Sequence, residues 1–241
     1  MTTYRAWNLK PLDRSALKEL TAAIAQQSTE ELENRAMETM DGEPWSEEKY
    51  QMTLAAQQKE AGLLAGILAA RGITDPAEAL TLLSGEEELT DPMLLTDMDK
   101  ACARILDAID REETIVVFGD YDVDGVTATA LLYQHLKGMG ANVKCMLPSR
   151  EGDGYGLSKN AIQSIHDKGC QLIVTVDNGI SALEEAEFAA SLGVDLIVTD
   201  HHLPHDTLPK AVAVVDPRRA DDTSPFKGLC GAGVAFKLCA A

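Results

Sequence analysis

The sequence lacks several features that would place the protein in a membrane or outside the cell. No apolar run approaches the roughly 20 residues that a membrane-spanning helix needs, and residues 1–7 contain no apolar signal-peptide core. The cysteines are few, odd in number and without metal-binding spacing: Cys102, Cys145, Cys170, Cys230 and Cys239. We therefore expect reduced thiols, no disulfide scaffold, no membrane association and a cytoplasmic location.

Basic residues are also scarce. Lys and Arg number 21 against 39 Asp and Glu, which gives a net charge of −18 over 241 residues. Proteins that bind nucleic acid are usually basic, so this balance opposes a polyanionic substrate unless bound cations reverse the local field. The remaining composition, 45% hydrophobic and 25% charged, is that of an ordinary globular protein with a sizeable core.

The chain divides into two regions by pattern. Residues 1–112 are predicted to be a helical N-terminal region, because apolar residues recur at helical spacing between helix-starting and helix-stopping residues. Expected starts are Ser46, Asp75 before Pro76, and Asp97. Residues 113–241 are predicted to form a separate domain.

In the second region, short apolar runs alternate with helical stretches. The runs are Thr114–Phe118, Asn142–Leu147, Gln171–Val176, Asp195–Thr199 and Ala211–Val215. The helical stretches are Val126–Met139, Ser158–Lys168 and Ser181–Leu192. Such alternation is typical of βαβ units with strands buried on both faces. The predicted fold class is α/β: a five-stranded, mainly parallel sheet flanked by helices and preceded by the helical region.

Acidic and polar groups follow four of the five predicted strands. They are Asp120, Asp122 and Asp124 after the first, Asp177-Asn178-Gly179 after the third, Asp200-His201-His202 after the fourth, and Asp216 with Arg218 after the fifth. Each group alone is also explained by an acidic turn, a helix cap or a surface pair. Together they should meet at one sheet edge, where open α/β sheets bind ligands.

Several carboxylates at one edge repel one another unless they are protonated or metal-bound. Carboxylates combined with imidazole suit Mn²⁺ or Mg²⁺. Two such ions, about 3.5–4 Å apart, can assist an in-line displacement at phosphorus. The sequence thus predicts a metal-dependent phosphoesterase site.

The order and spacing of these motifs resemble the DHH phosphoesterase superfamily. The resemblance rests on Phe118–Gly125, on Val176–Gly179 and on Thr199–His202. The loop containing Leu147–Arg150 and Gly154–Leu157, with the later stretch Gly231–Lys237, is similar to the RecJ-type branch, the exonucleases specific for single-stranded DNA.

The resemblance implies roles for individual residues. Metal ligands would be Asp120, Asp122, Asp124, Asp177 and His201, with Asp177 bridging two ions. Asp200 would orient the imidazole of His201, and His202 would face the scissile phosphate. Arg150 would hold a phosphate and Tyr155 would shape a nucleotide pocket. Asp122, Asp124, Asp177, His201 and His202 would be catalytic.

The implied function is 5′-to-3′ hydrolysis of single-stranded DNA with two Mn²⁺ (or Mg²⁺) ions, in DNA recombination and repair, with single-stranded-DNA-binding or helicase proteins as possible partners. Family members carry a further metal-binding Asp and a second lobe downstream of the position of Ala241. The resemblance therefore implies that the domain of residues 113–241 is incomplete at its C-terminal end, and we expect reduced activity from this chain. Three alternatives stay open. They are a non-catalytic lobe that acts as a binding module, a related phosphodiesterase acting on short oligonucleotides or cyclic dinucleotides, and a haloacid-dehalogenase-like phosphatase with Asp120 as nucleophile.

Overall fold

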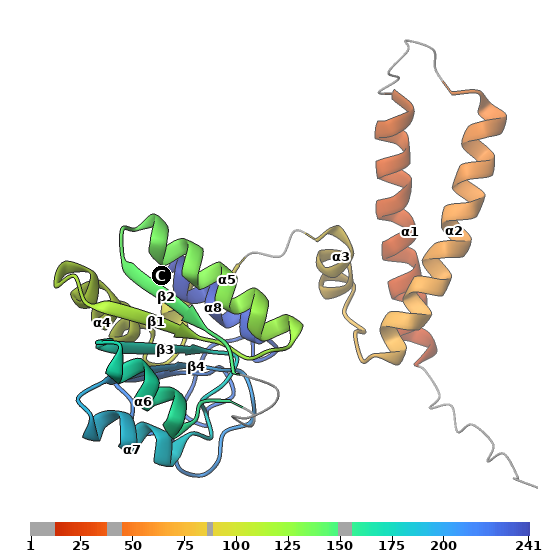
Figure 1. The fold of residues 1–241 in the computed structure, drawn as a ribbon. Helices are drawn as coiled ribbons and strands as arrows, with labels where there is room; N and C mark the ends of the chain where they lie inside the picture. The colour runs from red at the N-terminus through yellow and green to blue at the C-terminus, as the bar shows by residue number, and fades with distance from the viewer. Residues whose placement is uncertain (1–12, 38–44, 86–88, 149–155) are drawn as a thin grey trace, which may run out of the picture. The chain divides into compact units, whose positions relative to one another are not determined.

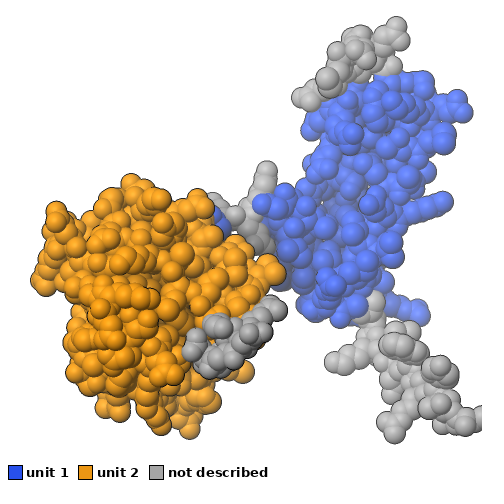
Figure 2. Space-filling view, in the orientation of Figure 1, with its two compact units in different colours: residues 1–89 blue, residues 90–241 orange. Residues whose placement is uncertain are grey.

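The computed structural model describes residues 13–37, 45–85, 89–148 and 156–241. The chain divides into two compact units, Met1–Leu89 and Thr90–Ala241 (Figure 2). No described helix is long and apolar enough to cross a membrane. Each unit has its own buried core.

The first unit is helical, as predicted. It contains α1 (Arg14–Met37), α2 (Glu47–Ala70) and α3 (Pro76–Ser84) (Figure 1). The expected capping residues are confirmed, because Ser46 accepts the backbone N–H of Lys49 and Asp75 accepts that of Glu78. A small core holds the helices together: Leu20, Ile24, Ala61, Ala65, Leu68, Ala69 and Ala79.

The second unit is an α/β domain with a five-stranded parallel sheet. Its elements are η1 (Pro92–Leu94), α4 (Met98–Asp110), β1 (Thr114–Phe118), α5 (Val123–Gly138), β2 (Asn142–Met146), α6 (Lys159–Asp167), β3 (Leu172–Val176), α7 (Leu183–Ser191), β4 (Asp195–Thr199), β5 (Ala213–Val215) and α8 (Gly231–Ala240). The strand order is β2-β1-β3-β4-β5, and every pairing is parallel. The predicted fold class is therefore confirmed.

Helices cover both faces of the sheet (Figure 1). Side chains of β1 alternate between the two layers: Ile115 and Val117 join the core beneath α4, α5 and α8, while Val116 and Phe118 join the core beneath α6 and α7. Burial on both faces explains why β1, β3, β4 and β5 are nearly continuous apolar runs. The edge strand β2 differs from this expectation, because it is largely exposed and contains Lys144.

The helix α4 belongs to the sheet domain in the structure, whereas the sequence-based division at residue 112 placed it in the helical region. Met98, Ala101, Ile105 and Ala108 of α4 are buried in the core against the sheet. The helical spacing of its apolar face revealed the helix, but spacing alone does not reveal which surface that face covers.

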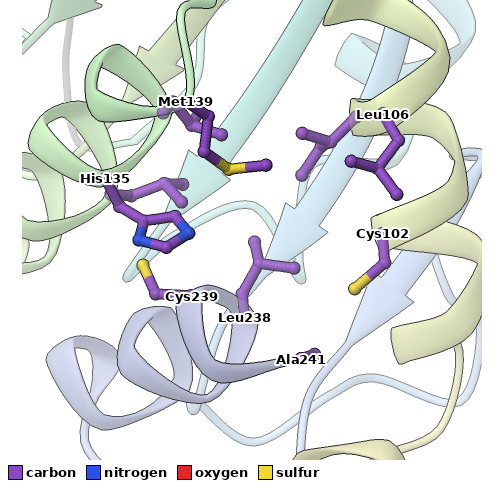
Figure 3. A pocket seen from close by; sticks show the side chains of 10 residues that line it. Cys102, Leu106, His135, Met139, Leu238, Cys239 and Ala241 are labelled. Carbon is purple, nitrogen blue, oxygen red and sulfur yellow. The ribbon is translucent and has the colours of Figure 1, made fainter.

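An apolar cavity of about 140 Å³ lies between α4 and the C-terminal parts of α5 and α8 (Figure 3). Cys102 and Cys239 line it together with His135 and Met139. Burial raises the pKa of the Cys239 thiol to about 11, so this thiol stays protonated at neutral pH. All five cysteines are free, as expected.

A partly buried ion pair links the start of α4 to the chain beyond β5. Nη1 of Arg219 donates to Oδ2 of Asp97 at 2.6 Å and also to the carbonyl oxygen of Val214. Burial opposes the charge on Asp97, but hydrogen bonds from Lys100 and Arg219 outweigh it and hold the pKa of Asp97 below its usual value.

We predict that Asp97→Asn lowers the free energy of unfolding by about 1.5–3 kcal/mol at pH 7, because a charge-assisted hydrogen bond is lost. Asn tolerates the left-handed backbone of this position (φ 64°). A lowered folded-state pKa stabilises the fold above about pH 4 and ceases to do so as pH falls through that lowered value. Urea unfolding from pH 7 to 3 should therefore show the difference between wild type and variant shrinking at acid pH.

The matched control is Asp99→Asn, an exposed acid in the first turn of the same helix. It should change the free energy of unfolding by less than about 1 kcal/mol. Equal effects of the two substitutions at every pH would contradict a stabilising role for the Asp97–Arg219 pair.

Candidate metal centre

The acidic groups converge at the carboxyl edge of the sheet, as the strand-end argument predicted. The chain runs from β1 outward to β2 and then back to β3, so the direction of strand addition reverses between β1 and β3. Crevices at such reversal points are where open α/β sheets bind ligands. Asp120 and Asp122 follow β1, and Asp177 follows β3.

The turn after β1 folds tightly because of one glycine. A Cβ at Gly125 would lie 2.6 Å from the backbone N and O of Asp120, so only glycine allows α5 to start this close to β1. Oδ1 of Asp122 accepts the N–H of Gly125 at 2.9 Å and caps α5. Asp120 is fully buried, and its Oδ1 accepts the N–H of Tyr121. Its Oδ2 has no hydrogen-bond partner among the described residues.

Asp177 lies at the centre of the site, where its backbone conformation and its burial are both energetically unfavourable. It is 2% exposed, and its φ of 61° lies in the left-handed region that side chains rarely adopt. Burial, with repulsion from Asp124 and Asp122, raises the pKa of Asp177 to about 7. Within the part of the chain that the structure describes, no hydrogen bond reaches its Oδ1. Strain, burial and an unsatisfied oxygen at one residue are typical of a functional position.

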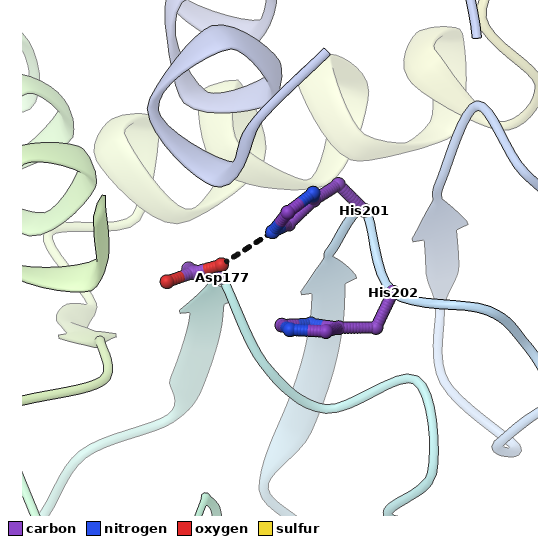
Figure 4. A group of neighbouring side chains, drawn as sticks. All are labelled: Asp177, His201 and His202. Carbon is purple, nitrogen blue, oxygen red and sulfur yellow. Dashed lines mark ion pairs between the residues drawn. The ribbon is translucent and has the colours of Figure 1, made fainter. Parts of the chain in front are cut away.

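His201 faces this carboxylate (Figure 4). Its Nε2 lies 3.0 Å from Oδ1 of Asp177 and 3.5 Å from Oδ2 of Asp124. Burial and the neighbouring His202 lower the pKa of His201, which favours the neutral imidazole. A neutral imidazole nitrogen beside carboxylate oxygens is a donor set for a divalent cation.

Asp200 bonds to the ring of His202 and not to that of His201, which differs from the expected arrangement. Its Oδ1 accepts Nδ1–H of His202 at 2.7 Å and the backbone N–H of His201 at 2.7 Å. Its Oδ2 accepts the N–H of Ile180 at 2.9 Å, so Asp200 also fixes the loop after β3. The tight turn after β4 brings the ring two residues away onto the carboxylate, while the ring of His201 points to Asp177.

Hydrogen bonding to Asp200 has an electrostatic consequence for His202. Burial disfavours the charged ring, but the carboxylate of Asp200 outweighs burial and raises the pKa of His202. The pKa values of the two adjacent histidines are thus shifted in opposite directions. The shift favours the neutral form of His201 and the charged form of His202. Such divergence is a feature of sites that divide roles between like residues.

Asp124 is held by the first turn of α8. Its Oδ2 accepts the N–H of Gly231 at 2.7 Å and its Oδ1 accepts that of Ala232 at 2.7 Å. Burial opposes its charge, but these amides outweigh burial and lower its pKa. The resemblance singled out the stretch Gly231–Lys237 but did not indicate that its amides would meet an acid of the first motif, which lies 107 residues away in the sequence.

The structure brings most predicted ligands into two groups that share one residue. Potential ligand atoms of Asp177, His201 and His202 lie within 4.8 Å of one another, and so do those of Asp120, Asp122 and Asp177. Asp124 belongs to neither group. The unpartnered Oδ2 of Asp120 and Oδ1 of Asp177, with one neutral imidazole, fit Mn²⁺ or Mg²⁺ in chemistry.

The other candidates occupy different positions. Asp216 is fully buried beside this edge, and burial raises its pKa to about 7, while Arg218 is exposed. Arg150 and Tyr155 lie outside the described residues. A cavity of about 390 Å³ adjoins His202 and is lined by Leu157 and the loop from Asn178 to Ala182.

The family of the chain follows from a comparison with known proteins. Residues 114–241, more than half of the chain, match the model of the DHH family, N-terminal domain. The chain belongs to the DHH family. The region of the match contains every acidic and histidine residue of the site described above.

Curated relatives support a closer similarity within the DHH family. The chain is 43% identical over 188 residues to the single-stranded-DNA-specific exonuclease RecJ of Bacillus subtilis (strain 168), a match that covers 77% of this chain and 24% of that protein. It is 42% identical over 177 residues to RecJ of Escherichia coli (strain K12), covering 73% and 30%. The chain therefore spans about a quarter to a third of the length of these relatives.

Solved structures agree with these relatives. RecJ of Thermus thermophilus in complex with Mn²⁺ superposes with a TM-score of 0.58 at 31% identity, covering 74% of this chain and 24% of that one. An exonuclease RecJ bound to manganese superposes with a TM-score of 0.55 at 37% identity, covering 60% and 37%. The DHH chain described here thus shares its fold with metal-bound nucleases.

The raised pKa of Asp177 predicts how the stability of the metal-free protein depends on pH. Between the usual carboxyl pKa near 3.9 and about 7, the folded state binds more protons than the unfolded chain, so the free energy of unfolding falls as pH rises. Asp177→Asn should flatten this fall. Urea unfolding in EDTA at pH 5 and pH 8 measures the slope.

Asp216→Asn is the matched control, because its carboxyl pKa is also raised to about 7 but it belongs to neither ligand group. Both variants should flatten the slope, while only Asp177→Asn should lose the stabilisation that millimolar Mn²⁺ provides. An Asp177→Asn protein that Mn²⁺ stabilises as strongly as wild type would rule out Asp177 as a ligand.

Proposed function

We propose that this chain carries the hydrolytic site of a 5′-to-3′ exonuclease specific for single-stranded DNA, working with two Mn²⁺ or Mg²⁺ ions. The observation that carries the proposal is the pair of ligand groups sharing Asp177 at the carboxyl edge of the sheet. The RecJ relatives, named as single-stranded-DNA-specific exonucleases, and the manganese-bound RecJ structures support it.

The residues present divide into two ligand sets. Asp120 and Asp122 would hold one ion and His201 the other, with Asp177 between them and Asp124 3.5 Å from the His201 nitrogen. When bound, such ions lower the pKa of a coordinated water and neutralise charge on the phosphate. The carboxylates would hold the ions at fixed positions, because backbone N–H groups donate to Asp122 and Asp124.

His202 is suited to contact the phosphate directly. Its Nδ1–H is committed to Asp200, its ring remains 45% exposed, and its raised pKa favours the imidazolium form. An imidazolium held in this way donates its second N–H to a developing negative charge on a phosphate or leaving oxygen. Asp200 therefore acts as the positioning residue for His202 in this proposal.

Attraction of the substrate needs cations, because the chain has a net charge of −18. Bound ions and Arg150 would supply that attraction, and Tyr155 would shape the nucleotide site. A role in DNA recombination and repair, a cytoplasmic location and partners that bind or unwind DNA belong to the same proposal and rest on the resemblance alone.

Single-stranded DNA labelled at either end tests the polarity. With Mn²⁺, 5′-labelled DNA should release labelled mononucleotide from the start, whereas 3′-labelled DNA should shorten stepwise; duplex DNA should persist. His202→Ala should lower kcat by about 10²–10⁴-fold, as expected for loss of a proton-donating group. His205→Ala, at an exposed histidine outside both ligand groups, should leave kcat unchanged.

Other outcomes would reassign the function. Hydrolysis of cyclic dinucleotides with no action on single-stranded DNA would indicate a different DHH phosphodiesterase. Tight Mn²⁺ binding with no hydrolysis of any of these substrates would indicate a binding module.

A further inference from the structure

The first turn of α8 lies between Asp124, which follows β1, and Asp177, which follows β3. The N–H groups of Gly231 and Ala232 each donate to one oxygen of Asp124 at 2.7 Å. The same turn touches Asp177 on its other side, because a Cβ built on Gly231 would lie 2.5 Å from Cβ and 2.6 Å from Cγ and Oδ1 of Asp177. One residue therefore contacts both carboxylate-bearing side chains.

Neither neighbour can easily yield to a larger residue at position 231. Asp177 has a strained backbone (φ 61°), is 2% exposed, and its N–H donates to the carbonyl of Thr199 at 3.1 Å. A methyl group at 231 must push either the carboxylate of Asp177 or the start of α8. Moving α8 would lengthen its hydrogen bonds to Asp124.

The rest of α8 is firmly anchored. Val234, Ala235 and Leu238 are buried in the core between the sheet and the helices α4, α5 and α8. Lys237 is 5% exposed, and its Nζ donates to Oγ1 of Thr90 at 2.9 Å and to the carbonyl of the same residue. The helix is thus fixed along its length, and its first turn is presented to the site at a set position.

We propose that the first turn of α8 sets the spacing between Asp124 and Asp177, and that Gly231 is a positioning residue of the metal centre. The proposal rests on the proposed function, because spacing of these acids matters only if they hold ions. The absence of a side chain at 231 allows the amide to reach Asp124 while the carboxylate of Asp177 stays against the helix. Catalytic constellations must be held within about 0.5 Å, so this contact determines whether both ions are retained.

Gly231→Ala and Gly233→Ala form a matched pair for the test. Both add one methyl to the first turn of the same helix, but a Cβ at 233 meets only side-chain atoms, Cδ2 of Leu229 at 3.2 Å being the nearest. Mn²⁺ binding to the 241-residue chain is measured by titration calorimetry, and folding is checked by circular dichroism. Gly231→Ala should weaken at least one ion by about 10- to 100-fold, as loss of a ligand's support does. Gly233→Ala should stay within about twofold of wild type.

Ala232→Pro provides a second route if Gly231→Ala does not fold. Proline at 232 removes the N–H that donates to Oδ1 of Asp124 and puts its ring carbon Cδ in place of that hydrogen, so it disturbs the contact with Asp124. It should also weaken Mn²⁺ binding. Its effect tests the contact of α8 with Asp124 separately from the contact of Gly231 with Asp177.

The outcomes separate this inference from the function on which it rests. A folded Gly231→Ala protein, or a folded Ala232→Pro protein, with wild-type Mn²⁺ stoichiometry and affinity would overturn the positioning role. Equal losses in Gly231→Ala and Gly233→Ala would overturn it too, because the effect would then be one of general helix packing. No Mn²⁺ binding by the wild-type chain would instead refute the proposed metal centre itself.

Discussion

Repulsion among carboxylates crowded at one sheet edge is the constraint on which the rest of this domain depends. Parallel strands all end on the same side, so the acids placed after β1, β3, β4 and β5 lie along one edge of the sheet. Partial burial there removes the water that would screen them. Burial is the main cause of the raised pKa values of Asp177 and Asp216, and repulsion from neighbouring carboxylates adds to it.

Hydrogen bonds from backbone amides offset most of this repulsion. Amide hydrogens reach the carboxylates of Asp120, Asp122, Asp124, Asp200 and Asp216. Among the described residues, no backbone amide donates to the carboxylate of Asp177, whose Oδ1 lies 3.0 Å from Nε2 of His201. The charge that the backbone leaves unbalanced is therefore concentrated at one residue, and that residue belongs to both ligand groups.

The sequence predicted those features of the fold and the site that follow from one local rule. It did not predict the contacts that depend on three-dimensional packing. Apolar runs located the five strands, and the strand-end rule placed Asp120, Asp122, Asp177 and His201 together. Asp200 bonds to the ring of His202 rather than to that of His201. This choice depends on the backbone conformation of one turn, which residue types do not determine. The hold of α8 on Asp124 joins positions 107 residues apart and has no local signature.

Under the proposed function, an acidic chain would act on a polyanion through positive charge localised at the bound ions. Net charge governs long-range attraction, but binding at a site depends on the field within a Debye length, about 8 Å at physiological salt. Two divalent ions held by the edge acids would supply positive charge at the point where a phosphate would bind, while the acidic surface elsewhere stays negative. DNA would then be attracted at the sheet edge and repelled elsewhere, which confines productive contact to the reacting phosphate. Acidity outside the site thus disfavours unspecific binding and is compatible with a nuclease whose cations do the attracting.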